Sequence, residues 1–363
     1  MDQTLSSLSA KNWDLVILGA GPAGLYTALE LKRLRSRARI LLVDRLPRIG
    51  GKLRYTGGGR CNLSQALDRE ALVQAFGKSG RFLYPAFKQL DPAALRNSLH
   101  SYGISTLIDS EGRIYPRSQS GLEVEASFSE AIRRAQIDLC LNTEIRSIHM
   151  ENENYVLQSA GGDEICSRRL VLASGCPAGK SAKSAPLSIC HVGALSLKLN
   201  LVQLQAALAA LESETVKSWK LAGISLPRVR IQYRPPKGAK ITEENAILFT
   251  HRGLSGPAIL NLSRHLLAGI EILWRIDIFR EPRSSGSDSS DPGLPKRLVR
   301  ALIDERGLDP HRLVINDLRV PDISSGMQCR GGISLKDLDP QSFTIKSMPG
   351  LYAVGDQVDL WWL

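Results

Sequence analysis

The stretch WDLVILGAGPAG, residues 13–24, decides the fold of this chain. Residues 15–18 form a short apolar run, and a G-x-G-x-x-G pattern interrupts it, which predicts a strand running into a turn. Residues 25–35 then carry apolar side chains at helical spacing, and residues 39–44 form a second apolar run that ends at Asp44. Together these patterns predict a β-α-β unit whose acidic residue follows the glycines at the distance expected for a dinucleotide site.

Each residue type in this unit suits the binding of a dinucleotide. Gly19 permits a tight turn, Gly21 lets a pyrophosphate approach the backbone, and Gly24 lets the helix pack on the strand. The start of the helix presents free N–H groups to the phosphate, and Asp44 can accept hydrogen bonds from a ribose diol. A glycine-rich turn in an ordinary α/β domain is the alternative. The order of strand, glycines, helix, strand and acid favours the dinucleotide site.

Length and composition describe a globular chain with two domains, or with a third small one in addition. The 363 residues are 43% hydrophobic and 23% charged. Residues 1–12 are polar and lack the apolar core of a signal peptide, and no apolar run reaches the roughly 20 residues that a membrane span requires. We therefore expect a cytoplasmic protein without membrane contact.

The net charge of +11, from 47 basic and 36 acidic residues, raises the question of a nucleic-acid partner. The basic residues occur only in short clusters without interleaved aromatic residues, such as Lys32-Arg33, Arg133-Arg134 and Arg168-Arg169. We therefore expect a solvated basic surface, part of which faces an anionic cofactor, and no nucleic-acid partner. The six cysteines include no C-x-x-C pair, which argues against a zinc ribbon or a disulfide framework and fits reduced thiols. We expect no metal site.

Two glycine clusters follow the β-α-β unit. They are GGK at residues 50–52 and TGGGRCN at residues 56–62, and they carry Lys52 and Arg60. A backbone of this kind can lie flat against a planar or phosphorylated ligand. A plain surface loop is the alternative, because loops are naturally rich in glycine.

These motifs, and above all TGGGRCN, resemble the flavoprotein family that includes aminoacetone oxidase and the bile-acid-modifying flavin oxidoreductases. Later segments also resemble that family, and the resemblance covers nearly the whole chain. These segments are YPRS at residues 115–118, FTHRGLSGP at 249–257, GGISL at 331–335 and PGLYAVGD at 349–356. The resemblance implies FAD as the cofactor.

Three further segments are similar to parts of flavoproteins with two dinucleotide-binding domains. Residues 171–175 resemble the strand and small-residue turn of the A-T-G segment, and residues 351–356 resemble the last strand, whose acid meets the ribitol or pyrophosphate. Residues 144–148 resemble the strand beside the adenine, where Ile145 is the expected contact. The complete set of expected cofactor-binding residues is Gly19, Ala20, Gly21, Pro22, Ala23, Gly24, Asp44, Arg45, Gly51, Lys52, Gly58, Gly59, Arg60, Cys61, Asn62, Ile145, Gly175, Gly355 and Asp356.

The expected fold class is α/β, with a Rossmann-like FAD-binding domain of the two-dinucleotide-binding type. Residues 1–195 and 326–363 would form that domain, and residues 196–325 would form an inserted substrate domain of mainly antiparallel strands with a shortened helical part. Strands are expected within 229–233, 246–249 and 270–279, a flexible loop at 283–293 and a helix at 294–303. Ser255 is expected to cap a helix, and Pro257 suits the first turn of that helix.

The resemblance implies an FAD-dependent oxidoreductase that transfers hydride between a small organic substrate and flavin N5, with NAD(P)H or oxygen as redox partner. Lys52 or Arg60 would stabilise negative charge on the reduced ring. Cys61 is either a small residue that fills a tight loop or a reactive thiol whose pKa the two cations lower. We assign no general acid or base, and a lone histidine such as His251 is more often a structural or surface group.

The chain departs from the family at two places. Relatives have a glycine and aspartate loop where residues 173–184 read ASGCPAGKSAKS, and this chain has Lys180 and Lys183 there instead. Relatives continue into a further helix where this chain reads DLWWL at residues 359–363, so fewer N–H donors would reach the FAD. The alternative function is therefore a catalytically silent nucleotide-binding protein that acts through a partner.

Overall fold

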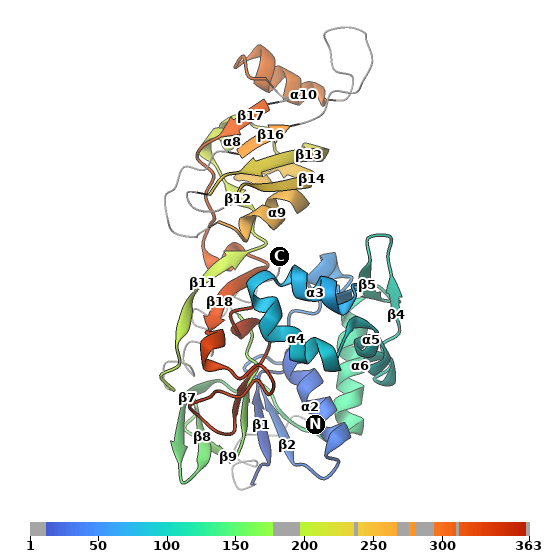
Figure 1. Cartoon of the computed structure of the whole chain (residues 1–363), viewed down its shortest axis with the longest axis vertical. Coiled ribbons are helices and arrows are strands. Elements are labelled where there is room, and N and C mark those ends of the chain that lie inside the picture. The colour runs from blue at the N-terminus through green and yellow to red at the C-terminus, as the bar shows by residue number, and fades with distance from the viewer. Residues whose placement is uncertain are drawn as a thin grey trace. The chain divides into compact units, whose positions relative to one another are not determined.

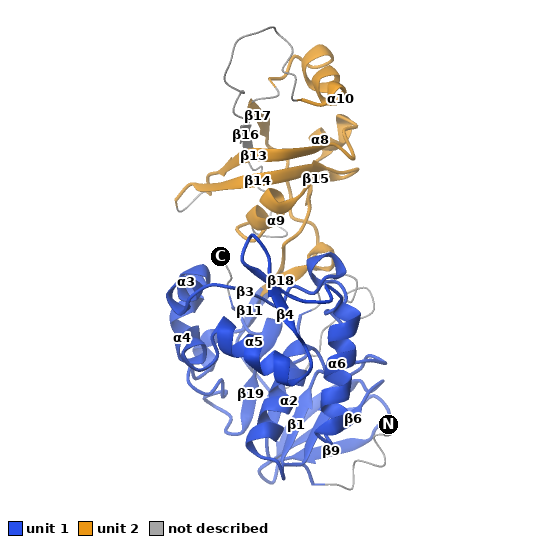
Figure 2. Ribbon diagram, turned by 90° about the vertical axis from the view of Figure 1, so that its right-hand side faces the viewer, with its two compact units in different colours: residues 1–177, 185–203, 331–363 blue, residues 178–184, 204–330 orange. Residues whose placement is uncertain are grey.

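The computed structural model describes residues 12–176, 197–235, 239–266, 276–279, 294–309 and 312–360. The chain divides into two compact units (Figure 2). Unit 1 comprises residues 1–177, 185–203 and 331–363, and unit 2 comprises residues 178–184 and 204–330. The expected loop at 283–293, the two lysines of the segment 177–184 and the last three residues lie outside the described residues.

Unit 1 is built on a parallel sheet of five strands in the order β19-β10-β1-β2-β6. Their bounds are β1 (Leu15–Leu18), β2 (Ile40–Val43), β6 (Asp138–Cys140), β10 (Leu170–Leu172) and β19 (Leu351–Ala353). All residues of β1 and β2 are buried. Such continuous apolar runs are characteristic of parallel strands covered on both faces.

Helix α2 (Pro22–Leu34) connects β1 to β2, so the predicted β-α-β unit is confirmed. The helix begins three residues earlier than the apolar spacing indicated, because Pro22 is suited to the first helical turn. Buried residues of α2 pack on the sheet, among them Leu25, Ala28 and Leu29. The fold is the expected Rossmann-like α/β arrangement.

The two faces of the sheet are covered by different elements (Figure 1). Leu15 and Ile17 of β1 share a hydrophobic cluster with residues of α2 and of α6 (Gly121–Arg134). Val16 and Leu18 point to the other face, because side chains alternate along a strand, and they share a cluster with the antiparallel strands β7 to β9. These strands are β7 (Ile145–Glu151), β8 (Asn154–Ser159) and β9 (Glu164–Ser167).

The remaining elements of unit 1 are short. A second three-stranded sheet has the order β3-β5-β4, with β3 (Ser64–Gln65), β4 (Thr106–Ile108) and β5 (Arg113–Pro116). The helices are α3 (Arg69–Ala75), α4 (Gly80–Gln89) and α5 (Pro92–Ser101), with the tighter turns η1 (Thr56–Gly59), η2 (Gly77–Ser79), η6 (Leu335–Asp337) and η7 (Gly355–Gln357). Aspartates cap two of these helices, since Asp68 accepts from the N–H of Ala71 and Asp91 from that of Ala94.

Unit 2 contains an antiparallel sheet of six strands in the order β12-β15-β14-β13-β16-β17. The strands are β12 (Leu211–Glu212), β13 (Ser225–Tyr233), β14 (Ile241–Phe249), β15 (Gly253–Ser255), β16 (Ile276–Phe279) and β17 (Arg312–Ile315). Helices α8 (Glu214–Ser218), α9 (Pro257–Ser263) and α10 (Lys296–Val299) accompany it, with turns η4 (Arg300–Asp304) and η5 (Ile323–Ser325). The chain passes between the units within β11 (Leu201–Ala207) and β18 (Gln328–Ile333).

The predicted strands at 229–233 and 246–249 are confirmed, and so is the end of the third at residues 276–279. The predicted helix at 294–303 is present as α10 followed by the π-helical turn η4. The prediction that Ser255 caps α9 is wrong. Ser255 is the last residue of β15, and the cap is Gly256, whose φ of 94° is one that glycine adopts without strain.

Two expected absences concern membranes and metals. Within the described parts of the chain, no helix is long and apolar enough to cross a membrane. The same residues include no group of three or more histidine, cysteine, aspartate or glutamate side chains that could hold a metal ion.

We predict that Gly24→Ala destabilises the protein. A Cβ atom at Gly24 would lie 1.9 Å from the carbonyl oxygen of Gly19, so α2 would have to move away from β1. We expect the free energy of unfolding to fall by about 2–3 kcal/mol, as for overpacking of a core. Denaturant unfolding followed by circular dichroism measures the change.

The matched control is Gly21→Ala. Gly21 has an ordinary φ of −75°, and no atom lies within 4 Å of its Cβ position. Its unfolding free energy should change by less than about 1 kcal/mol. Equal losses in the two variants would contradict the close packing described for Gly24.

Candidate functional site

The glycines of the turn after β1 differ in their φ angles and in the space around their Cβ positions. Gly19 has a φ of 116°, and a Cβ there would lie 2.4 Å from the carbonyl oxygen of Ala173. Gly24 is equally confined by the carbonyl of Gly19. Gly21 has an ordinary φ, and no protein atom lies within 4 Å of the position where a Cβ atom would be. The space at Gly21 is therefore open to a ligand.

That space lies at the N-terminus of α2. Leu25 is the residue whose N–H closes the first turn, on the carbonyl of Gly21 at 2.9 Å. Pro22 has no N–H, and the N–H groups of Ala23 and Gly24 have no helical carbonyl one turn before them. These groups and the positive end of the helix dipole suit a diphosphate.

Asp44 is fixed against the same turn. Its Oδ2 atom accepts a hydrogen bond from the N–H of Ala20 at 2.7 Å, and its Oδ1 atom accepts one from the N–H of Leu46 at 2.8 Å. Burial raises the pKa of Asp44, and these two N–H donors oppose that effect. Each carboxylate oxygen has two lone pairs, so Asp44 keeps acceptor capacity for a ribose hydroxyl beside the glycine turn.

Lys52 connects three distant segments at the carboxyl edge of the parallel sheet. Its Nζ atom lies 3.2 Å from the Sγ atom of Cys176 and 3.2 Å from the Oδ2 atom of Asp356. Lys52 belongs to the loop after β2, Cys176 follows β10, and Asp356 lies in η7 after β19. In open α/β sheets, ligands bind outside the carboxyl ends of the strands.

The turns at this edge also bring predicted glycines together. Gly355 has a φ of 76°, and a Cβ there would lie 2.9 Å from the Cβ of Ala23, so the end of β19 meets the start of α2. Gly175 has a φ of 69° and no atom within 4 Å of its Cβ position. The N–H of Gly50 donates to the carbonyl of Ala20 at 2.7 Å, which attaches the loop that contains Gly51 to the turn.

Two residues at this edge were missed by the sequence analysis. Cys176 was expected only as a departure from the family, although it directly follows the predicted Gly175. Gln357 is fully buried, with its Nε2 atom donating to the carbonyl of Leu172 and its Oε1 atom accepting from the Oγ of Ser174 at 3.0 Å. No local pattern marks a glutamine for burial, so the adjacent acid at residue 356 was the available signal.

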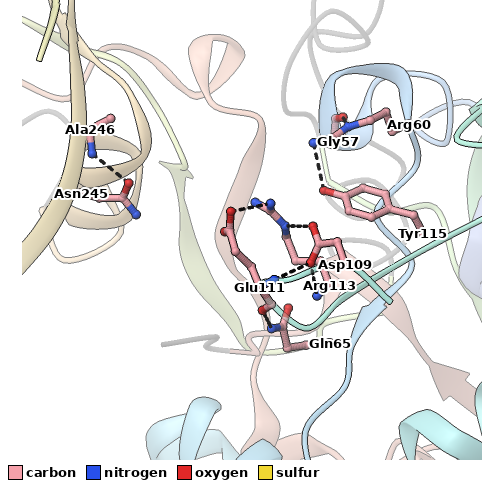
Figure 3. Close-up of polar contacts among 9 residues, drawn as sticks. All are labelled: Gly57, Arg60, Gln65, Asp109, Glu111, Arg113, Tyr115, Asn245 and Ala246. Atoms are coloured by element: carbon pink, nitrogen blue, oxygen red, sulfur yellow. Dashed lines mark hydrogen bonds and ion pairs between the residues drawn. The ribbon is translucent and has the colours of Figure 1, made fainter. Parts of the chain in front are cut away.

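The TGGGRCN loop forms η1, and its contacts are mainly with the β3-β5-β4 sheet. Gly57, Gly58 and Gly59 have φ values of 58°, 70° and 93°. Arg60 donates from Nη2 to the hydroxyl of Tyr115 at 3.2 Å and from Nε to the carbonyl of Gly57 at 3.2 Å (Figure 3). Its guanidinium carbon lies 4.6 Å from the centre of the Tyr115 ring. Arg60 therefore holds the loop in shape, a role that the sequence did not indicate.

Cys61 and Asn62, at the end of this loop, lie in opposite environments. Asn62 is exposed, whereas Cys61 is fully buried. Burial raises the pKa of the Cys61 thiol, which argues against the interpretation in which nearby cations lower this pKa. The structure supports the other interpretation, in which a small side chain fills a tight turn.

The last predicted positions lie around the end of β2. Arg45 directly follows Asp44. Ile145 is buried at the start of β7, two residues after Thr143, whose N–H donates to the carbonyl of Asp44 at 2.9 Å. His251 is exposed in the turn between β14 and β15 of unit 2.

A glycine turn with an open position, a helix start with free donors and a fixed acid define a dinucleotide-binding protein of the Rossmann class. The family model described as HI0933-like protein Rossmann domain matches residues 13–361, and the chain belongs to this family. It is an FAD-dependent oxidoreductase at the level of class, with FAD as its cofactor, as the sequence resemblance implied.

Two relatives match almost the full length of the chain. The ribosomal RNA dihydrouridine synthase of Escherichia coli is 26% identical, and the match covers 96% of this chain and 92% of that protein. The 3-dehydro-bile acid delta(4,6)-reductase of Clostridium scindens is 23% identical, and the match covers 95% of this chain and 92% of that protein.

Solved flavoenzyme structures share the fold. The 3-ketosteroid-delta4-(5alpha)-dehydrogenase of Rhodococcus jostii RHA1 is 12% identical with a TM-score of 0.51, and the match covers 99% of this chain and 93% of that one. A quinol fumarate reductase from E. coli is 13% identical with a TM-score of 0.50 over 97% of this chain, which spans 66% of that protein.

We predict that Gly21→Val abolishes FAD binding while the protein stays folded. The valine side chain would fill the open position at the start of α2 and exclude the diphosphate. The ratio of flavin absorbance to protein absorbance after FAD addition and gel filtration measures this loss. Retention of FAD with unchanged affinity would show that the diphosphate lies elsewhere.

We also predict that the Cys61 thiol is unreactive in the native protein. Because burial raises its pKa, its thiolate fraction at neutral pH is smaller than that of a free thiol, and alkylation should require higher pH. Iodoacetamide labelling followed by peptide mass spectrometry measures the pH profile at this residue. Alkylation at neutral pH as fast as that of a free thiol would contradict the buried placement, and Cys61→Ser should keep its FAD.

Proposed function

We propose that this protein reduces a carbon–carbon double bond that is conjugated to a carbonyl group. The observation that carries the proposal is that two relatives, each matched over more than nine tenths of its length, are named for this reaction type on unlike substrates. Formation of dihydrouridine saturates the ring double bond of uridine, which is conjugated to a carbonyl. A delta(4,6)-reductase acts on double bonds conjugated to the 3-keto group of a steroid. The reaction type that the two relatives share is more informative about this chain than the identity of either substrate.

The proposed reaction adds one hydride and one proton across the double bond. The hydride goes to the carbon β to the carbonyl and the proton to the α carbon, and NAD(P)H supplies the two electrons by oxidation to NAD(P)⁺. Bound FAD supplies the hydride carrier, with N5 as the transferring atom. Oxygen is the competing acceptor for the same electrons. We place this activity in the cytoplasm.

Lys52 has the placement for an electrostatic role in this reaction. Asp356 and Cys176 hold its ammonium group at the carboxyl edge of the sheet, next to the turns of Gly175 and Gly355. A positive charge that is already in position stabilises negative charge that develops on a reduced cofactor or on a carbonyl oxygen. We propose Lys52 for this role rather than Arg60, because the contacts of Arg60 are with Gly57 and Tyr115.

We propose unit 2 as the substrate domain. Its antiparallel sheet and separate hydrophobic core provide an independent scaffold, and the interval 196–325 expected for the insert overlaps residues 204–330 of this unit. The competing function is a catalytically silent nucleotide-binding protein. The altered sequence of residues 173–184 is the observation that favours it.

The test uses matched pairs of hydride acceptors. The FAD-loaded protein is photoreduced without oxygen and mixed with a 3-keto-4,6-diene steroid or its saturated 3-ketone, and separately with uridine or dihydrouridine. We expect the flavin absorbance to return with the unsaturated member of at least one pair, together with an equivalent amount of saturated product found by mass spectrometry. The saturated members should leave the flavin reduced.

The two ways of failing are distinct. A protein that binds FAD but is reoxidised by neither unsaturated acceptor would refute the reaction class. A protein that stays colourless with added FAD would instead favour the catalytically silent alternative.

A further inference from the structure

A groove of about 950 Å³ lies beside the amino-terminal ends of the strands in unit 1, away from the glycine turn. It is lined by residues at the end of α2, in the turn before β2, and at the starts of β1, β10 and β19. The turns that contribute to the FAD site are all at the carboxyl ends of these strands. The groove is therefore separate from the site described above.

Three arginines give this groove a positive charge. Arg35 and Arg37 lie between α2 and β2, and Arg169 directly precedes β10. All three are exposed, and within the described part of the chain none forms an ion pair with a carboxylate. Asp14 also lines the groove, and its Oδ2 atom accepts a hydrogen bond from the backbone N–H of Arg39 at 2.8 Å.

The floor of the groove is apolar and includes an aromatic ring. Leu31 and Tyr352 are half-buried there, Val171 of β10 is buried, and Leu34 at the end of α2 is 65% exposed. A charged rim above an aromatic and aliphatic floor is the combination that binds single-stranded nucleic acids, whose phosphates pair with arginine and whose bases stack on aromatic rings.

We propose that this groove binds a single-stranded segment of RNA. Arg35, Arg37 and Arg169 contact the phosphates, and Tyr352 stacks against a base. The net charge of +11 and the sequence pI of about 9.5 agree with a polyanionic partner. The name of the E. coli relative, a ribosomal RNA dihydrouridine synthase, favours RNA over an acidic protein.

This inference reverses the expectation that the chain has no nucleic-acid partner. That expectation rested on the dispersal of basic residues along the sequence. Folding brings Arg169 to residues 35 and 37 because β1 pairs with β10 on one side and with β2 on the other. The inference deepens the proposed function for a nucleobase substrate, but RNA binding itself requires neither FAD nor turnover.

The experiment measures binding of a fluorescein-labelled oligouridine strand by fluorescence anisotropy over a range of salt concentrations. The variant carries Arg35→Gln, Arg37→Gln and Arg169→Gln together in the full-length protein. We expect its Kd to rise roughly ten-fold or more, and the slope of log Kd against log salt to fall by about 2, from about 0.7 for each lost phosphate contact. Tyr352→Leu should raise the Kd about ten-fold without changing the slope.

Arg81→Gln is the matched control, because Arg81 is an exposed arginine of α4 that does not line the groove. It should bind oligouridine as the unmodified protein does, and all variants should unfold at the same temperature. An unchanged Kd in the triple variant, or an equal loss in Arg81→Gln, would overturn the proposal. Displacement of oligouridine by polyglutamate at equal charge, with no effect of Tyr352→Leu, would assign the groove to acidic proteins instead.

The outcome of the oligouridine-binding experiment can be distinguished from the outcome of the acceptor assay. Binding is measured on the FAD-loaded protein without NAD(P)H or an acceptor, so it requires no turnover and a failed reduction assay leaves the RNA result standing. Conversely, a protein that reduces the steroid acceptor but does not bind oligouridine would retain the proposed reaction and lose the RNA surface.

Discussion

The contact between the backbone at Gly24 and the carbonyl oxygen of Gly19 is the constraint on which the rest of unit 1 depends. It brings the first turn of α2 against the end of β1, where no side chain fits. With the helix in that place, its free N–H groups lie at the carboxyl edge of the sheet. The hydrogen bond from the N–H of Ala20 to Asp44 then fixes the acid beside them. Phosphate donors and ribose acceptor are thus set by backbone packing before any ligand binds.

The carboxyl edge and the amino edge of the sheet have different chemistry. The carboxyl edge gathers glycines, an acid and a paired lysine, which suits a single bound nucleotide of defined shape. The amino edge gathers arginines that form no ion pair with a carboxylate among the described residues, above an apolar floor, and this combination suits a polyanion of variable sequence. Both arrangements arise from the same five parallel strands. The segment that precedes each strand lies at the amino edge, and the segment that follows it lies at the carboxyl edge.

The sequence predicted those features that depend on local patterns. The glycine turn, α2 and Asp44 are contiguous enough for spacing alone to identify them, and the strands of unit 2 follow from their alternation. Ser255 was assigned as a cap because its residue type is suitable, but the positive φ of Gly256 ends the strand and begins the helix instead. Arg60 was assigned to the cofactor by its position in a motif, and its hydrogen bond with Tyr115, 55 residues further along the chain, is a contact that the motif does not indicate. The pairing of Lys52 with Cys176, the burial of Cys61 and Gln357, and the approach of Arg169 to Arg35 are tertiary, and no local pattern encodes them.

The bridge formed by Lys52 has a consequence for the order in which the protein matures. Its two partners lie 124 and 304 residues further along the chain. Because translation runs from the N-terminus, the β1-α2-β2 crossover leaves the ribosome before β19 and Asp356 do. The nascent chain therefore contains the glycine turn, α2 and Asp44 before it contains Asp356, and the ion pair between Lys52 and Asp356 can form only after η7 has been made.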